Sequence, residues 1–320
     1  MSELNVAVIA QDGLALEALL EGWADSPLAA AQLSLVTAVV SAEVQTAFYD
    51  GRPLAFQSIE DFDFSDMALV IVLEKSALVE SYKDVLKALS CPVLGFMSEL
   101  GCLEPQAFDG SFVEGAKVVG LAQPAVSALK HVLSDAVCES VDVTAFYPVS
   151  FYGKAGVSEL ASQTARLLNA QALEYGVFQT QMTFHYFPMA CGLEGQMVEE
   201  SLISEIQQAF DIDDVHVLAM QMPVFHGVGL SISVVLADVP EIHVLIERWK
   251  SDASIVFQEG VQGLSNYDVL QIEGMLQLGR VQQSKIDENR LDLWIAYDES
   301  KFGIGKNLIN VAEFLLKHYL

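Results

Sequence analysis

The sequence predicts an α/β protein, with a doubly wound, mostly parallel sheet in its N-terminal part and an α+β arrangement in the rest. Over the first 128 residues, short apolar runs alternate with helical patterns, which is typical of βαβ units. Further along, longer runs alternate polar with apolar residues and are separated by amphipathic helices. This second pattern indicates a sheet with helices on one face and its other face free to pack on something else.

The N-terminal elements are predicted from their apolar spacing. Residues 67–73 are apolar throughout, so this strand is expected to be buried on both faces. A turn at residues 11–13 leads into a helix in which Leu16 and Trp23 belong to one apolar stripe. The predicted strands are residues 5–10, 33–40, 67–73, 92–96 and 117–121, and a second helix covers residues 77–89.

The C-terminal elements follow the two periods of strand and helix. The alternating run of Leu291, Leu293 and Ile295 predicts a half-buried strand, and the period becomes helical from Gly305. The intervening turn contains Lys301 and Gly303, and the residues expected on one face of the closing helix are Leu308, Val311, Phe314 and Leu315. The other strands are expected at residues 141–146, 216–221 and 229–236, and helices at residues 157–168, 199–210 and 241–251.

The charge balance narrows the classes of function. The 320 residues include 16 Lys and Arg against 43 Asp and Glu, a formal net charge of −27. Nucleic acids and anionic membrane surfaces need basic contacts, so neither is an expected partner. Because 52% of the residues are hydrophobic, the chain is not a disordered acidic segment. The charge is therefore interpreted as a source of solubility.

Neither a secretory signal nor a membrane segment is expected. No basic segment precedes the first apolar run, and Asp12 interrupts that run. The uncharged stretch 217–237 is long enough to cross a bilayer, but Pro223 and its glycines favour β-structure. The four cysteines have no CxxC or other metal-ligand spacing. These features predict reduced thiols in a cytoplasmic protein without a metal site.

Three segments carry a resemblance to a known family. Residues 146–156 are Phe-Tyr-Pro-Val-Ser-Phe-Tyr-Gly-Lys-Ala-Gly, residues 223–231 are Pro-Val-Phe-His-Gly-Val-Gly-Leu-Ser, and residues 290–320 form the closing strand–turn–helix. They resemble the aspartate-semialdehyde dehydrogenase family, and the departures described below resemble its Usg-type paralogues. The resemblance extends over essentially the whole chain.

The resemblance implies a domain organisation and a partner. It implies a Rossmann-like, NAD-binding-type domain at residues 1–128, to which the final helix at residues 301–320 returns. Residues 129–300 are similar to the dimerisation domain of the family, so the implied partner is a second copy of the chain, in a homodimer.

In the family the first βα turn holds the dinucleotide with a motif similar to Gly-Ala-Thr-Gly-Ala-Val-Gly, whose glycines let the backbone approach the pyrophosphate. The matching residues here are Ala10-Gln-Asp-Gly13-Leu-Ala-Leu16, so Gly13 is the one remnant of a cofactor-binding motif. Asp12 places a negative charge where phosphate would lie, and residues 39–43 offer no Arg or Lys for the 2′-phosphate of NADP. The expectation is an eroded site without cofactor; the alternative is NAD or NADP bound in an unfamiliar mode through water and backbone.

The catalytic cysteine of the family has no counterpart in the matching segment. The family carries it in an Asn-Cys-Ser/Thr turn, where a helix N-terminus lowers the thiol pKa. The matching segment is residues 120–127, in which Val126 or Pro124 takes the position, and no cysteine lies between Cys102 and Cys138. Cys138 is expected to be a packing thiol rather than a nucleophile.

The remaining catalytic and anion-binding positions also differ from the family. The resemblance assigns these roles: an orienting Gln, a carboxylate-binding Arg, a general-base His and two further anion-binding cations. In this sequence the five positions are held by Tyr147, Gln221, Val228, Gly101 and Leu202, in that order.

His226 is the weak substitute for the missing base. It lies two residues before Val228 and is therefore expected on the same face of a strand. A histidine beside glycines more often has a structural role, and that alternative stays open.

A framework without its chemistry predicts a catalytically inactive homologue, a pseudoenzyme that acts as a dimeric interaction or regulatory protein. Losing a single member of a catalytic unit typically reduces the rate by orders of magnitude. The first alternative is an active NAD(P)-dependent semialdehyde dehydrogenase, an oxidoreductase of amino-acid biosynthesis. The second is a small-molecule binding module in a remodelled cleft, which would take a ligand less anionic than aspartyl phosphate.

Overall fold

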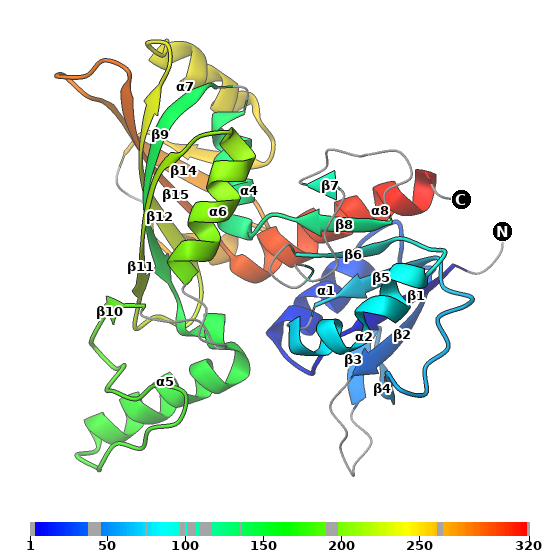
Figure 1. Cartoon of the computed structure of the whole chain (residues 1–320). Coiled ribbons are helices and arrows are strands. Elements are labelled where there is room, and N and C mark those ends of the chain that lie inside the picture. The colour runs from blue at the N-terminus through cyan, green and yellow to red at the C-terminus, as the bar shows by residue number, and fades with distance from the viewer. Residues whose placement is uncertain are drawn as a thin grey trace. The chain divides into compact units, whose positions relative to one another are not determined.

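The computed structural model describes residues 4–37, 46–73, 76–96, 100, 107–108, 117–134, 136–189, 198–260 and 265–318. By their contacts these residues form two compact units, drawn in Figure 1: Met1–Gln123 with Gly303–Leu320, and Pro124–Phe302. The sequence-based positions at residues 39–43 and Gly101 lie outside the described residues.

The first unit contains a largely parallel sheet. In the described part of the unit, the strand order is β3-β4-β2-β1-β5-β6-β8-β7, and β3 with β4 is an antiparallel pair. The strands are β1 (Asn5–Ile9), β2 (Gln32–Thr37), β3 (Thr46–Tyr49), β4 (Arg52–Ser58), β5 (Leu69–Val72), β6 (Val93–Phe96), β7 (Ala107–Phe108) and β8 (Val118–Leu121).

Helices cover both faces of this sheet, which confirms the doubly wound prediction. Alternate residues of β1 point into two separate cores: Val6 and Val8 belong to one, Ala7 and Ile9 to the other. The first core also contains residues of α1 (Leu14–Ala24) and α8 (Ile309–His318). The second contains Leu86 of α2 (Ser76–Ala88). Strands buried on both faces need apolar residues at every position, which explains the continuous apolar runs.

The hairpin of β3 and β4 is an element that the sequence analysis missed. Asp50 and Gly51 form its turn with positive φ angles of 48° and 71°. Asp-Gly is the residue pair that a two-residue hairpin turn of this type favours. The signal was therefore present in the sequence, between two short runs without clear alternation.

The second unit contains a mixed sheet with helices on one face. Figure 1 shows α4 and α6 on the same side of this sheet. In the described residues the strand order is β10-β11-β9-β12-β15-β14-β13. The strands are β9 (Cys138–Tyr147), β10 (Phe187–Pro188), β11 (Asp214–Gln221), β12 (Val228–Leu236), β13 (Ile255–Gln258), β14 (Leu276–Gln283) and β15 (Arg290–Tyr297). The helices are α4 (Pro124–Leu133), α5 (Gly153–Leu168), α6 (Val198–Phe210) and α7 (Ile242–Ser251).

The border between the units lies at residues 123 and 124, a few residues before the predicted one. The reason is helix α4, which packs against α6 and belongs to the second unit with all its residues. None of the described helices combines the length and the apolarity that a membrane crossing would need.

The chain end differs from the prediction in two details. Instead of a turn at Lys301 and Gly303, the π-helical segment η4 (Glu299–Leu308) runs directly into α8. The buried face of the closing helix is also rotated from the predicted one: Phe314 is 39% exposed. The residues that are buried are Leu308, Ile309, Ala312, Leu315 and Leu316.

Candidate functional site

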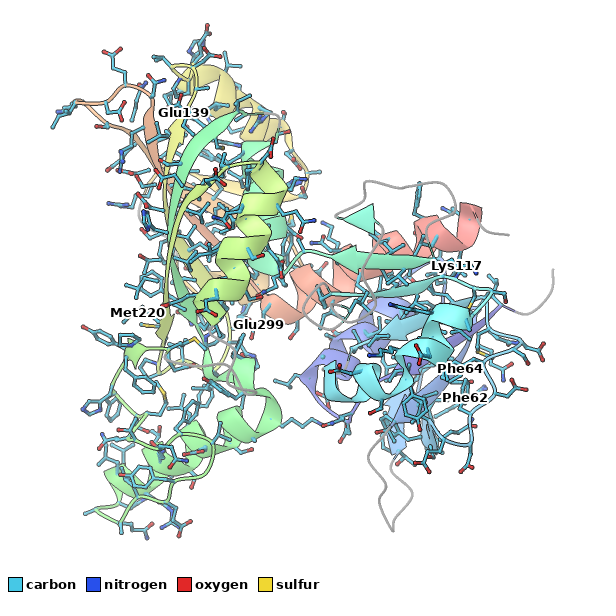
Figure 2. All side chains as sticks on the ribbon, in the orientation of Figure 1. Phe62, Phe64, Lys117, Glu139, Met220 and Glu299 are labelled. Atoms are coloured by element: carbon cyan, nitrogen blue, oxygen red, sulfur yellow. The ribbon has the colours of Figure 1, made fainter. Side chains whose placement is uncertain are left out.

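Four strand ends of the second unit meet at one edge of its sheet. Tyr147 ends β9 and lies opposite Gln221 at the end of β11. Val228 begins the antiparallel β12 and lies opposite Tyr297 at the end of β15. Figure 2 shows Met220 and Glu299 near this edge and Glu139 at the other end of the sheet. The structure therefore brings together three of the predicted positions, Tyr147, Gln221 and Val228.

The three side chains at these positions are buried and lack the chemistry of a base or a cation. Tyr147, Gln221 and Val228 are exposed by 5%, 0% and 2%. Burial raises the pKa of the Tyr147 hydroxyl, and the nearby charge of Glu205 on α6 raises it further. A phenol that stays neutral at physiological pH does not accept a proton. Val228 has no polar group, so this set cannot perform general-base catalysis.

Gln221 is held by the backbone around it. Its Nε2 donates to the carbonyl oxygens of Tyr147 at 3.1 Å and Met222 at 3.3 Å. Its Oε1 is buried and has no hydrogen-bond partner among the described residues. Reversing the amide would direct Oε1 at the two carbonyl oxygens, so this orientation is the sound one. Gln221 thus offers an acceptor where the family resemblance implies a cationic donor.

The nucleophile position is also apolar and buried. Val126, in the first turn of α4, is fully buried, and Pro124 begins the helix. The described cysteines, Cys91 and Cys138, are buried. Burial raises the pKa of both thiols, that of Cys138 to about 11. Because the thiolate is the reactive form, neither is a nucleophile at neutral pH.

His226 does not lie on a strand, contrary to the prediction. β12 begins at Val228, and Gly227 turns the chain with a φ of +90°. The imidazole Nδ1 lies 3.5 Å from Glu299 Oε1, and the Asn266 amide donates to the His226 carbonyl oxygen at 3.0 Å. His226 therefore precedes the strand that holds Val228 and is paired with a carboxylate.

Glu299 collects further donors. The Ser150 hydroxyl donates to Glu299 Oε1, and the Gly227 amide donates to Oε2 at 3.0 Å. Burial raises the pKa of Glu299, but the hydrogen bonds from His226, Ser150 and Gly227 outweigh it and lower the pKa. The same pair raises the pKa of His226 against the effect of burial. Sequence reasoning found His226 but missed Glu299, because a distance of 73 residues carries no periodic signal.

The first βα turn of the first unit is filled rather than open. Ala10 and Leu16, at two positions of the glycine motif, are each 1% exposed and belong to the core beneath α1. Gly13 has an extended φ of 179°, and a Cβ there would meet nothing within 4 Å. Its conformation therefore does not require glycine, and Asp12 and Gln11 beside it are exposed.

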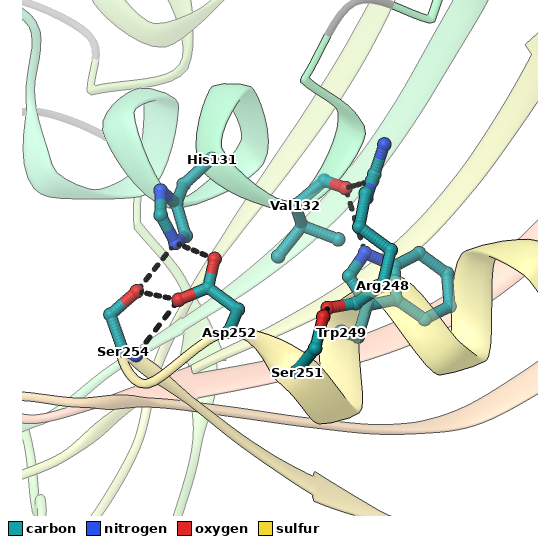
Figure 3. A network of polar contacts seen from close by, with 7 residues as sticks. All are labelled: His131, Val132, Arg248, Trp249, Ser251, Asp252 and Ser254. Atoms are coloured by element: carbon teal, nitrogen blue, oxygen red, sulfur yellow. Dashed lines mark hydrogen bonds and ion pairs between the residues drawn. The ribbon is translucent and has the colours of Figure 1, made fainter.

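A second polar cluster resembles a catalytic triad but does not have its geometry. His131 Nε2 lies 3.1 Å from Asp252 Oδ2 and 2.7 Å from Ser254 Oγ (Figure 3). The Ser254 hydroxyl donates to Asp252 instead of the imidazole. In a triad the two imidazole nitrogens face the serine and the acid separately; here one nitrogen faces both.

The residues around this cluster indicate a structural role. Arg248 and Trp249 both donate to the carbonyl oxygen of Val132, which ties α7 to the end of α4 (Figure 3). Such donors stabilise the last carbonyls of a helix. Among the described residues no cluster of three His, Cys, Asp or Glu side chains could hold a metal ion.

Comparison with known proteins connects this chain to one family. The family described as semialdehyde dehydrogenase, dimerisation domain, matches residues 129–299. The protein named "USG-1 protein homolog" from Pseudomonas aeruginosa is 27% identical over 340 residues, which cover 99% of both chains. "Aspartate-semialdehyde dehydrogenase 2" from Vibrio cholerae is 23% identical over 99% of both chains.

Solved structures show the same fold. The crystal structure of aspartate semialdehyde dehydrogenase II from Vibrio cholerae, in complex with ASA, has a TM-score of 0.89 at 21% identity and covers 100% of both chains. A probable aspartate-semialdehyde dehydrogenase from Pseudomonas aeruginosa has a TM-score of 0.87 at 26% identity, again over 100% of both chains. The Candida albicans enzyme with NADP has a TM-score of 0.70 at 12% identity.

Proposed function

The chain belongs to the semialdehyde dehydrogenase family, and on that premise we propose that it is a catalytically inactive homologue of aspartate-semialdehyde dehydrogenase. The chain forms a homodimer, and this dimer acts by binding other proteins. One observation carries the proposal: the positions that resemble the catalytic centre hold the buried residues Val126, Tyr147, Gln221 and Val228. None of them is a nucleophile or a base at neutral pH.

The absence of cofactor is part of the proposal. Ala10 and Leu16 occupy the space near the βα turn with core side chains, and Asp12 repels a pyrophosphate. The alternative is an active NAD- or NADP-dependent oxidoreductase. A thermal-shift titration with each nucleotide at millimolar concentration separates the two, because a ligand at 100 times its dissociation constant stabilises the native state by about 2.7 kcal/mol. We expect no shift with either nucleotide; a saturable rise of several degrees would overturn this part.

The homodimer is supported by the sheet face of the second unit that lies away from α4 and α6. Asp142 and Thr144 of β9 are half-buried there, and Leu218 of β11 is 45% exposed. A groove on this face is lined by residues of β9, β11, β12, β14 and β15. A sheet of this kind can leave one face uncovered by its own chain, and this face is open to a partner. The matched family domain is named for dimerisation.

The dimer is tested by light scattering on the eluted protein. A charge on the free sheet face, Leu218→Glu, should lower the measured mass from that of a dimer towards a monomer at low micromolar concentration. The matched control is Phe48→Glu in the first unit, whose side chain is 72% exposed and which should leave the dimer unchanged. A wild-type protein that elutes as a monomer would contradict the proposal.

A second candidate is a small-molecule site at the edge formed by Tyr147 and Gln221. The buried Gln221 Oε1, without a partner in the described part of the chain, favours it, since a buried unsatisfied acceptor is costly. A ligand that donates a hydrogen bond would satisfy this atom. Native mass spectrometry of the freshly purified protein tests the candidate: a bound mass that is lost in Gln221→Leu supports it, and a ligand-free spectrum contradicts it.

A further inference from the structure

The carboxylate of Glu299 joins three segments that are far apart in the sequence. It follows β15 and accepts the Ser150 hydroxyl, from the segment after β9, and the Gly227 amide, from the segment before β12. The His226 imidazole stands 3.5 Å from Oε1. We name this set of four residues, Ser150, His226, Gly227 and Glu299, the Glu299 cluster.

Backbone contacts hold the same segments together. The Val149 and Ser150 amides donate to the carbonyl oxygens of Val224 at 2.9 Å and Phe225 at 3.1 Å. Residue 227 is closely confined, since a Cβ there would lie 2.6 Å from the Asn266 carbonyl oxygen. The Glu299 cluster therefore lies where these three segments meet, at the sheet edge that also holds Tyr147 and Gln221.

We propose that the Glu299 cluster is a proton-operated latch: with His226 protonated it holds the segment at residues 222–227 closed over the sheet edge, and deprotonation of His226 loosens it. The geometry supports this because the imidazole is the one titratable donor in the cluster. The Ser150 and Gly227 donors are present at every physiological pH. Their two hydrogen bonds hold the carboxylate in place while the His226 contact changes strength.

The charges around His226 favour its protonated form. Glu299 and, with a smaller effect, Asp298 act on the imidazole, while Lys301 acts on Asp298. Tyr297 is also in the field of Glu299 and stays neutral, because burial raises its pKa well above the ordinary value. Two carboxylates thus face one lysine and the imidazole, and the pKa of His226 is raised.

The direction of the pH effect follows from both partners. Because the pKa of His226 is raised, His226 stabilises the cluster fully below its ordinary pKa of 6.5. This stabilisation is lost as the pH rises through the pKa of the folded state. Because the pKa of Glu299 is lowered, Glu299 stabilises the cluster fully above its ordinary pKa of 4.5. This stabilisation is lost as the pH falls through the pKa of the folded state. The latch is therefore tightest between pH 4.5 and 6.5 and loosens towards alkaline pH.

Amide hydrogen exchange at Gly227 measures the latch directly, because this amide donates to Glu299. In the full-length protein we expect its protection factor, corrected for the intrinsic rate at each pH, to fall between pH 5.5 and 8.5. His226→Asn should give at pH 5.5 the protection that the wild type shows at pH 8.5. Equal wild-type protection at both values would overturn the proposal.

Two controls keep the test specific. His243→Asn removes an exposed histidine, 3.7 Å from Glu241 with both side chains at least 75% exposed, and should leave Gly227 protection unchanged. An NMR titration of His226 should give a pKa above 6.5 that falls in Glu299→Gln; a value at or below 6.5 would contradict the proposal even if a variant failed to fold. The proposed pseudoenzyme role does not enter these readouts, so the two can fail separately.

Discussion

The two units differ in what they place at the positions where the resemblance implies function. In the first unit, two positions of the βα turn where the resemblance implies glycine hold Ala10 and Leu16, which are apolar residues of the core. In the second unit, the sheet edge carries a polar network in which Glu299 contacts His226 and Gly227. The difference teaches that apolar packing at one position leaves no titratable group, whereas the network around Glu299 contains the imidazole of His226, which titrates.

The substitution Leu16→Gly tests the role of the Leu16 side chain at the βα turn. Leu16 is 1% exposed in the core beneath α1. Removing such a side chain costs about 2–5 kcal/mol, and glycine inside a helix adds about 1 kcal/mol. We expect a loss of this combined size in urea denaturation, with no gain of NADP binding. Restored nucleotide binding would mean that the leucine alone closed the site.

Alanine substitutions at two glycines, one in each unit, extend the comparison. In Gly227→Ala the new Cβ would lie 2.6 Å from Asn266 O at a φ of +90°, and strain of this kind costs about 1–3 kcal/mol before the clash is counted. Gly13→Ala meets open space at an extended φ and should cost less than about 1 kcal/mol, mainly as a poorer helix cap. Chemical denaturation of both variants checks the order; equal losses would contradict it.

Neutralising the Glu299 carboxylate should lower the free energy of unfolding by less than Gly227→Ala does. Glu299→Gln weakens the charge-assisted contacts to Ser150, Gly227 and His226, and we expect a loss of about 1–2 kcal/mol near pH 6. Glu288→Gln, at an exposed position, is the matched control and should stay within about 0.5 kcal/mol of wild type. Identical melting temperatures for both variants would remove Glu299 from the stabilising network.

The smallest expected effect is the pH dependence of stability that His226 contributes. Its raised pKa predicts that the wild-type melting temperature falls more steeply than that of His226→Asn as the pH rises above 6.5. Melting curves at several pH values check this, and parallel curves for the two proteins would contradict it. The effect is small because the imidazole is 35% exposed, so that solvent screens the pair.

The fold was largely predictable because periodicity records burial. The apolar runs of β1 and β5 and the alternation in β9 are direct consequences of having two buried faces or one. The hairpin with Asp50 and Gly51 and the rotated face of α8 were missed. In the first case short strands gave little periodicity. In the second, apolar residues occur at most positions of α8, so their spacing alone did not select the buried face.

The sequence placed three of the candidate residues on strands, but it did not predict their contacts. The resemblance located Tyr147, Gln221 and Val228, and the strand register places them at one edge. The pairing of His226 with Glu299 joins the segment before β12 to the start of η4, 73 residues further along the chain, and no local pattern records such a contact. The strand assigned to His226 was wrong because Gly227, with its φ of +90°, interrupts the extended backbone.

A dehydrogenase assay tests the inferred loss of catalysis most directly. The purified full-length protein, at micromolar concentration, is incubated with aspartate semialdehyde, phosphate and NADP, and then with NAD, while NADPH or NADH formation is followed. We predict no rate above that of the mixture without protein, since Val126, Tyr147 and Val228 supply neither nucleophile nor base. A saturable rate that increases in proportion to protein concentration would contradict the pseudoenzyme proposal.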